Sequence, residues 1–135
     1  AITSQFINCL DSLRPEFSII VYDSPDHDGH ASGWASPQYM EALHTLDGYI
    51  ARIIEATKRL GMYDETVFIV TADHETGGLV VVDGDEHTGR VTGVYVSDDH
   101  TPAMLPVFAY GPGADKFCGT YMNTEIARRI KSLIK

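Results

Sequence analysis

Short apolar runs and a long helical pattern alternate along the first half of the chain. Residues 17–22 (FSIIVY) and 67–70 (VFIV) are rich in β-branched and aromatic side chains, which predicts two buried strands. Between them, apolar residues recur at helical spacing over residues 36–60, behind the helix start signal Ser36-Pro37. A strand, a long helix and a second buried strand predict a βαβ crossover, which implies a mostly parallel sheet.

The other elements predicted from the pattern are shorter. Apolar positions at helical spacing predict a helix near each end of the chain, and three further apolar runs predict strands. The helices are predicted from residue 2 to 13 and from Asn123 onward, and the strands over residues 79–82, 91–96 and 106–110, with a turn at Asp83-Gly84-Asp85. The chain contains no internal repeat, low-complexity segment or linker, so the pattern predicts a single α/β unit over residues 1–135.

Composition narrows the classes of function. The 135 residues carry a formal net charge of −9, whereas nucleic-acid binding needs a basic face, so no nucleic-acid-binding surface is expected. No apolar run approaches the length of a membrane span. An acidic chain with six His residues is well supplied with ligands for divalent cations, and such cations allow an anionic substrate to approach. Cys9 and Cys118 are compatible with one disulfide or with two thiols, and their spacing, which follows no pattern, favours thiols.

Both predicted strands of the crossover run directly into a cluster of Asp and His. Asp26 and His30 lie four positions apart in a predicted loop after the first strand, Asp73-His74 follows the second strand, and His100 precedes the last one. Open α/β sheets place their chemistry at the carboxyl ends of strands, so we expect these five side chains to converge there. Carboxylate oxygen and imidazole nitrogen are ligands of Zn²⁺, and a cluster without Cys favours catalysis or anion binding over structural support.

Other candidates for chemistry carry weaker signals. His44 falls within the long predicted helix, so we interpret it as a surface or packing residue, and His87 falls in a polar turn, so we interpret it as solvent-exposed. His27 adjoins Asp26 but points elsewhere in any loop that aims Asp26 and His30 at one metal. The chain has no Gly-x-Ser-x-Gly elbow, no Cys with a neighbouring His in sequence and no P-loop, which argues against the common serine, cysteine and P-loop enzymes.

Three motifs in order resemble the metal-binding half of the alkaline phosphatase superfamily. They are Asp26-x-x-x-His30, Asp73-His74 within TADHETGG, and His100-Thr101 ahead of PVFAYGPGA. The resemblance covers nearly the whole chain. It implies a three-layer α/β/α sandwich with a mostly parallel central sheet, and it makes residues 1–135 the C-terminal part of a larger catalytic domain.

The resemblance also implies roles for the five residues. Asp26, His30 and His100 would bind one zinc ion, and Asp73 and His74 would bind a second. In the family, the second zinc ion also takes an upstream Asp and the Ser or Thr nucleophile, and neither is recognisable here. We therefore expect no catalytic residue in this chain, little activity of the chain alone, and a missing N-terminal part of the same enzyme as its partner. The family mechanism is two in-line displacements through a phospho-enzyme, and the resemblance favours a periplasmic or extracellular location.

Two features leave the branch of the superfamily open. Enzymes with a third, magnesium site have a Glu shortly before the position of Asp26, where this chain has Asp23-Ser24-Pro25; Asp23 is therefore only a candidate for an additional metal ligand. The pattern of Pro25–His30 resembles the phosphodiesterase and nucleotide pyrophosphatase branch. The function expected is zinc-dependent hydrolysis of phosphate monoesters, with two alternatives: a phosphodiesterase or nucleotide pyrophosphatase, and a metal-binding domain without catalysis.

Overall fold

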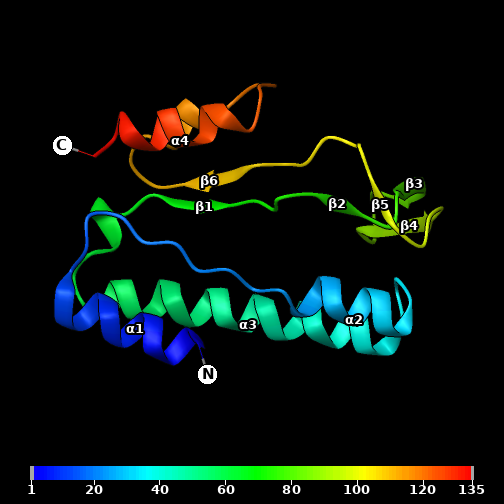
Figure 1. Ribbon diagram of the computed structural model, residues 1–135, viewed down its shortest axis with the longest axis horizontal. Helices are drawn as coiled ribbons and strands as arrows, with labels where there is room; N and C mark the ends of the chain where they lie inside the picture. Colours follow the sequence, from blue (N-terminus) through cyan, green and yellow to red (C-terminus); the bar gives the residue numbers. More distant parts are fainter. Residues whose placement is uncertain (1, 135) are drawn as a thin grey trace. The chain divides into compact units, whose positions relative to one another are not determined.

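The computed structural model describes residues 2–134, and Figure 1 shows the order of their elements. Helices occupy most of the first half of the chain, and the short strands that the structure describes all lie in the second half. In chain order the elements are α1 (Ile2–Leu13), α2 (Ser24–Ser32), α3 (Pro37–Arg59), the 3-10 helix η1 (Tyr63–Glu65), β1 (Phe68–Val70), β2 (Glu75–Thr76), β3 (Leu79–Asp85), β4 (Arg90–Tyr95), β5 (His100–Thr101), β6 (Phe108–Tyr110), the 3-10 helix η2 (Ala114–Phe117) and α4 (Thr124–Lys131).

The helical predictions for α1 and α3 are confirmed. The α1 helix buries Thr3 and Leu10 on one face. At the start of α3, the Tyr39 backbone N–H donates a hydrogen bond to Ser36 Oγ at 3.1 Å, so Ser36 caps the helix as expected. Gly61 follows the end of α3 with φ of 67°, a left-handed conformation that glycine adopts at helix ends.

Contacts divide the chain into two compact units, which are described separately. Unit 1 comprises the residues up to Val21, Asp47–Thr71 and the residues from Pro106 onward, and unit 2 comprises Tyr22–Leu46 and Ala72–Leu105. In unit 1, β1 and β6 pair antiparallel, with Phe68 opposite Tyr110 and Val70 opposite Phe108. The most buried side chains of unit 1 include Leu10, Ala56, Thr57 and Phe117.

Unit 2 contains two small antiparallel pairs of strands. The β2–β5 pair places Glu75 opposite Thr101 and Thr76 opposite His100. The β3–β4 pair is a hairpin, and its turn lies at residues 86–89 rather than at the predicted Asp83-Gly84-Asp85, which belongs to β3. The Asp85 carboxylate explains the shift, because it accepts hydrogen bonds from the backbone N–H groups of His87 and Thr88 and so begins the turn itself.

The mostly parallel central sheet is not found among the described residues. All three pairs of strands are antiparallel, and residues 17–22 form no strand ladder. Most side chains of this segment are exposed, with Ile19 at 75% and Val21 at 71% of full exposure, while Ile20 and Tyr22 are half-buried. The β-branched composition of the segment predicts burial, but burial requires a covering surface, and the described chain covers the segment only in part. Of the described helices, none combines the length and the apolar character that a membrane span requires.

Candidate metal centre

The predicted loop around Asp26 and His30 is a helix, α2, which lies in unit 2. Pro25 sits in the first turn of α2 and Gly33 follows its end, and these positions favour a short helix rather than a loop. A separation of four residues places Asp26 and His30 on the same face, one turn apart. The helix therefore sets the spacing of the first two candidate ligands.

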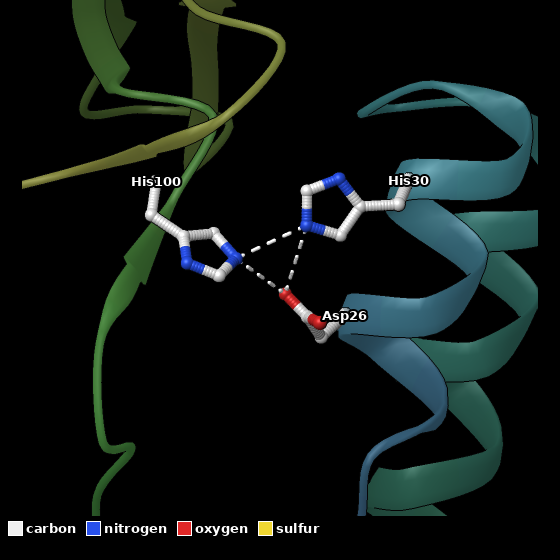
Figure 2. A group of neighbouring side chains, drawn as sticks. All are labelled: Asp26, His30 and His100. Carbon is white, nitrogen blue, oxygen red and sulfur yellow. Dashed lines mark hydrogen bonds and ion pairs between the residues drawn. The ribbon is translucent and has the colours of Figure 1, made fainter.

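His100 brings the third candidate ligand to the same point, from β5 in the same unit. Figure 2 shows the three side chains pointing toward one another. His100 Nε2 lies 3.1 Å from Asp26 Oδ1 and 3.0 Å from His30 Nε2, and His30 Nε2 lies 3.7 Å from Asp26 Oδ1. All three side chains remain between 37% and 40% exposed, so an ion between them would be accessible from solvent.

The spacing of the three atoms fits a zinc ion. A triangle with sides of 3.0, 3.1 and 3.7 Å has a circumscribed radius of about 1.9 Å, slightly less than the zinc–ligand distances of about 2.0–2.2 Å. Two imidazole nitrogens and one carboxylate oxygen suit Zn²⁺ better than Mg²⁺, which prefers oxygen ligands. Three protein ligands are also the usual number at a catalytic zinc site that keeps one position open. Ligation by these residues stays a prediction.

Asp73 and His74 form a pair next to this cluster. The rings of His74 and His100 stack, with centroids 3.7 Å apart and planes 20° from parallel. His74 Nε2 lies 3.7 Å from Asp73 Oδ1, while the Asp73 side chain is 89% exposed. All five predicted ligands therefore belong to unit 2, and three of them converge on one point.

The remaining candidates lie outside the converging group. Asp23 is at the start of α2 and lines a shallow pocket of about 530 Å³ with Asp26, His27 and His30. His27 makes a contact of 3.2 Å with Asp28 and not with the cluster. His44 on α3 and His87 in the β3–β4 turn are exposed, which confirms their interpretation as surface residues. A metal role for Asp23 stays a prediction.

Two further residues, Glu75 and Thr101, link the strands next to the candidate ligands. The Thr101 hydroxyl donates a hydrogen bond to Glu75 Oε2, and the backbone N–H of Leu79 donates one to Glu75 Oε1 at 3.2 Å. The first bond joins β5, which carries His100, to β2, which follows His74, and the second joins β2 to the start of β3. The hydrogen bond from Thr101 lowers the pKa of Glu75 below its usual range, and backbone N–H groups add to this effect. The signal in the sequence is the position of Glu75, directly after His74.

Replacing Thr101 with valine is expected to raise the pKa of Glu75 toward its usual value, because the hydroxyl donor is lost. A lowered pKa in the folded state stabilises the fold above the unfolded pKa of about 4.3 and loses that contribution as the pH falls through the folded pKa. Thr101→Val should therefore be less stable at neutral pH and lose less stability in the acid range. NMR titration of the Glu75 carboxyl carbon and urea unfolding at several pH values measure both effects.

Thr88→Val is the matched control for this prediction. The Thr88 hydroxyl donates a hydrogen bond of 2.8 Å to Asp85 Oδ2 in the β3–β4 turn, and this bond is the main cause of the lowered pKa of Asp85. The control should raise the pKa of Asp85 and leave that of Glu75 unchanged. A Glu75 pKa that does not move in Thr101→Val would contradict the role assigned to the hydroxyl.

Comparisons of the sequence with known proteins match phosphodiesterases and phosphatases. The family model for type I phosphodiesterase / nucleotide pyrophosphatase matches residues 1–115. The chain is 30% identical to human ectonucleotide pyrophosphatase/phosphodiesterase family member 1 over 70 residues, which are 52% of the chain and 8% of that protein. It is 46% identical to alkaline phosphatase 4 of Bacillus subtilis over 41 residues, which are 30% of the chain and 9% of that protein.

Solved structures agree with the sequence matches. The alkaline phosphatase of the Antarctic bacterium TAB5 superimposes with a TM-score of 0.63 and 28% identity, over 82% of this chain and 32% of that enzyme. Variants of the TAB5 enzyme are described with Mg bound in the M3 site. The chain thus spans about a third of the solved enzyme and less of the curated relatives. With the family model covering most of the chain, the chain belongs to the type I phosphodiesterase / nucleotide pyrophosphatase family of the alkaline phosphatase superfamily.

Proposed function

We propose that this chain supplies the C-terminal metal ligands of a zinc-dependent phosphoric ester hydrolase. The observation that carries the proposal is the convergence of Asp26, His30 and His100, whose ligand atoms lie 3.0 to 3.7 Å apart although His100 is 70 residues from His30. A carboxylate and two imidazoles meeting at one solvent-accessible point are what an open zinc site requires.

The proposal assigns a role to each residue of the cluster. Asp26, His30 and His100 hold one zinc ion, and Asp73 and His74 hold part of the coordination sphere of a second. Bound zinc supplies Lewis-acid stabilisation of the phosphoryl group and of the leaving oxygen. The His74 ring supports the His100 ring by stacking, and the Glu75–Thr101 hydrogen bond keeps β5 beside β2 so that His100 faces α2.

The substrate proposed is a phosphate monoester, hydrolysed through a phospho-enzyme. Similarity to the TAB5 alkaline phosphatase over 82% of the chain supports this choice. The second candidate is hydrolysis of a phosphodiester or nucleotide pyrophosphate, which the family model over residues 1–115 and the similarity to the human relative support. A metal-binding domain without catalysis is the third candidate, because this chain contains no recognisable nucleophile.

We also propose that residues 1–135 form the C-terminal part of a larger catalytic domain. The chain covers about a third of the solved enzyme that it resembles. The β3–β4 hairpin exposes Val81, Val82, Val91 and Val94, which suits strands that pack against further protein. The missing nucleophile and an additional Asp ligand would come from that further part.

Assays with two chromogenic esters test the function. We expect the zinc-loaded chain alone to hydrolyse p-nitrophenyl phosphate and bis-p-nitrophenyl phosphate only weakly, because covalent catalysis needs an activated nucleophile. A longer product of the same gene is expected to hydrolyse the monoester faster. Faster turnover of the diester would select the second candidate, and no turnover of either ester by the longer product would select the third. Equal rates for the chain and the longer product would require a nucleophile within these residues, and Thr76 is the first to replace.

A further inference from the structure

Trp34 occupies a turn whose backbone is strained. It lies between α2 and α3, and its two neighbours both have positive φ: 90° at Gly33 and 62° at Ala35. Positive φ is uncommon for a residue with a side chain, and such strain persists where the surrounding structure holds it in place. The turn directs Trp34 back toward α2, where its ring meets Gly29 and His30.

The indole of Trp34 packs between two glycines of unit 2, Gly29 and Gly77. A Cβ atom added at Gly29, on α2, would overlap carbons of the Trp34 six-membered ring. A Cβ atom added at Gly77, between β2 and β3, would lie 2.7 Å from Trp34 Cδ1 and 2.5 Å from Tyr95 Cδ1. Both glycines are buried, so only the absence of a side chain at each position lets the indole reach across from α2 to the strand that follows His74.

Aromatic rings surround the indole on its other sides. Its centroid lies 5.7 Å from that of Tyr39 at 85°, and 6.3 Å from that of Tyr95 at 31°. Tyr39 is buried, and burial together with a hydrogen bond to Tyr39 raises the pKa of Tyr95 above its usual range. The fourth ring is His30, whose centroid lies 5.1 Å from that of Trp34 at 64°, an edge-to-face arrangement. One side of the His30 ring is thus set by Trp34, and its Nε2 faces His100.

We propose that Trp34 is a positioning residue for the metal centre, holding the His30 ring in the orientation that aims Nε2 at His100 and Asp26. The inference rests on the zinc site of the proposed function and adds to it a residue that does not contact the metal. Figure 2 shows the reason for such support: His30 comes from a helix and His100 from a strand, so their meeting depends on how α2 is held. Groups that hold a metal ligand from behind typically change metal affinity by about 10- to 100-fold when removed.

Zinc titration calorimetry of Trp34 variants tests the proposal. We expect Trp34→Ala to bind zinc about 10- to 100-fold more weakly than the unmodified chain. Trp34→Phe keeps an aromatic ring between Gly29 and Gly77, so it should retain most of the zinc affinity of the unmodified chain. Gly29→Ala keeps the indole but adds a methyl group where the indole packs, so it should also weaken zinc binding. Ser32→Ala, on the same helix, should not.

Metal-free NMR separates positioning from general folding. Three-bond couplings of His30 report its χ1 angle; we expect one rotamer in the unmodified chain and in Trp34→Phe, and averaging in Trp34→Ala with the circular dichroism spectrum retained. Unchanged zinc affinity in a folded Trp34→Ala, or a single His30 rotamer in it, would overturn the proposal. A chain that binds no zinc while its His30 rotamer still depends on Trp34 would overturn the proposed zinc site and keep the positioning role. If Trp34→Ala does not fold, Gly29→Ala gives the same decision.

Discussion

Replacing His100 with alanine should lower the affinity of the chain for Zn²⁺ by at least about 100-fold, because even groups that only support a ligand contribute about 10- to 100-fold. His100 Nε2 is central to the cluster, since it lies within 3.1 Å of both Asp26 Oδ1 and His30 Nε2. In the variant, this cluster retains only two candidate ligands, Asp26 and His30, and both come from α2. Calorimetric titration should show loss of the tighter binding phase, and a weaker phase from Asp73 and His74 should remain.

His87→Ala is the matched control for this experiment. His87 is also an exposed histidine of unit 2, but it lies in the β3–β4 turn. Its replacement should leave both binding phases unchanged. If the tighter phase survives in His100→Ala, His100 is not a ligand and the zinc site has been assigned to the wrong residues.

Replacing Gly111 with alanine should lower the free energy of unfolding by about 3 kcal/mol or more, through backbone strain combined with overpacking. Gly111 follows β6 and has φ of 110°, a region that residues with a side chain rarely adopt. An added Cβ would also overlap the Thr66 carbonyl oxygen and lie 3.1 Å from Val67 Cα. Backbone atoms cannot rotate away as a flexible side chain can, so the β1–β6 pair would have to separate. Urea unfolding with a fitted m-value measures the effect.

Gly61→Ala separates the two causes. Gly61 belongs to the same unit and also has positive φ, at 67°, but an added Cβ there meets nothing within 4 Å. Only the cost of placing a residue with a side chain in the left-handed conformation remains, so the free energy of unfolding should fall by about 1 to 2 kcal/mol. Equal losses at the two glycines would show that the close approach of Gly111 to Thr66 contributes nothing to stability.

The helices α1, α3 and α4, unlike α2, could be predicted from the sequence because their signals are local. The apolar spacing of α1 and α3 and the cap at Ser36 are all within a few residues of the elements that they define. Strand pairing is set by residues far apart in the chain. The run at residues 67–70 contains β1, yet its partner is β6, some 40 residues later and antiparallel, and residues 17–22 have the composition of a strand without a ladder. The alternation and composition of a segment indicate whether it is buried, but they do not indicate which strand it pairs with.

In the candidate site, too, some residues could be predicted from the sequence and others could not. The order of Asp26, His30 and His100 along the chain was sufficient to group them, although the segment around Asp26 was expected to be a loop and is helical. The supporting residues could not be found like this, because their roles are defined by contacts across the unit. Glu75 matters through Thr101, which is 26 residues away, and Trp34 through Gly77, which lies on the far side of α3 and β1 in the chain.

The ligand spacing also has a consequence for the stability of the chain. Cys9 and Cys118 are free thiols, so no covalent bond links distant parts of the described residues. A metal ion shared by His30 and His100 would act as a cross-link that closes a loop of 70 residues. Unlike a disulfide, the ion is released when the chain unfolds, so it stabilises the fold by its binding free energy, about 2.7 kcal/mol at a free ion concentration 100 times the dissociation constant. Metal loading and resistance to unfolding would then rise together.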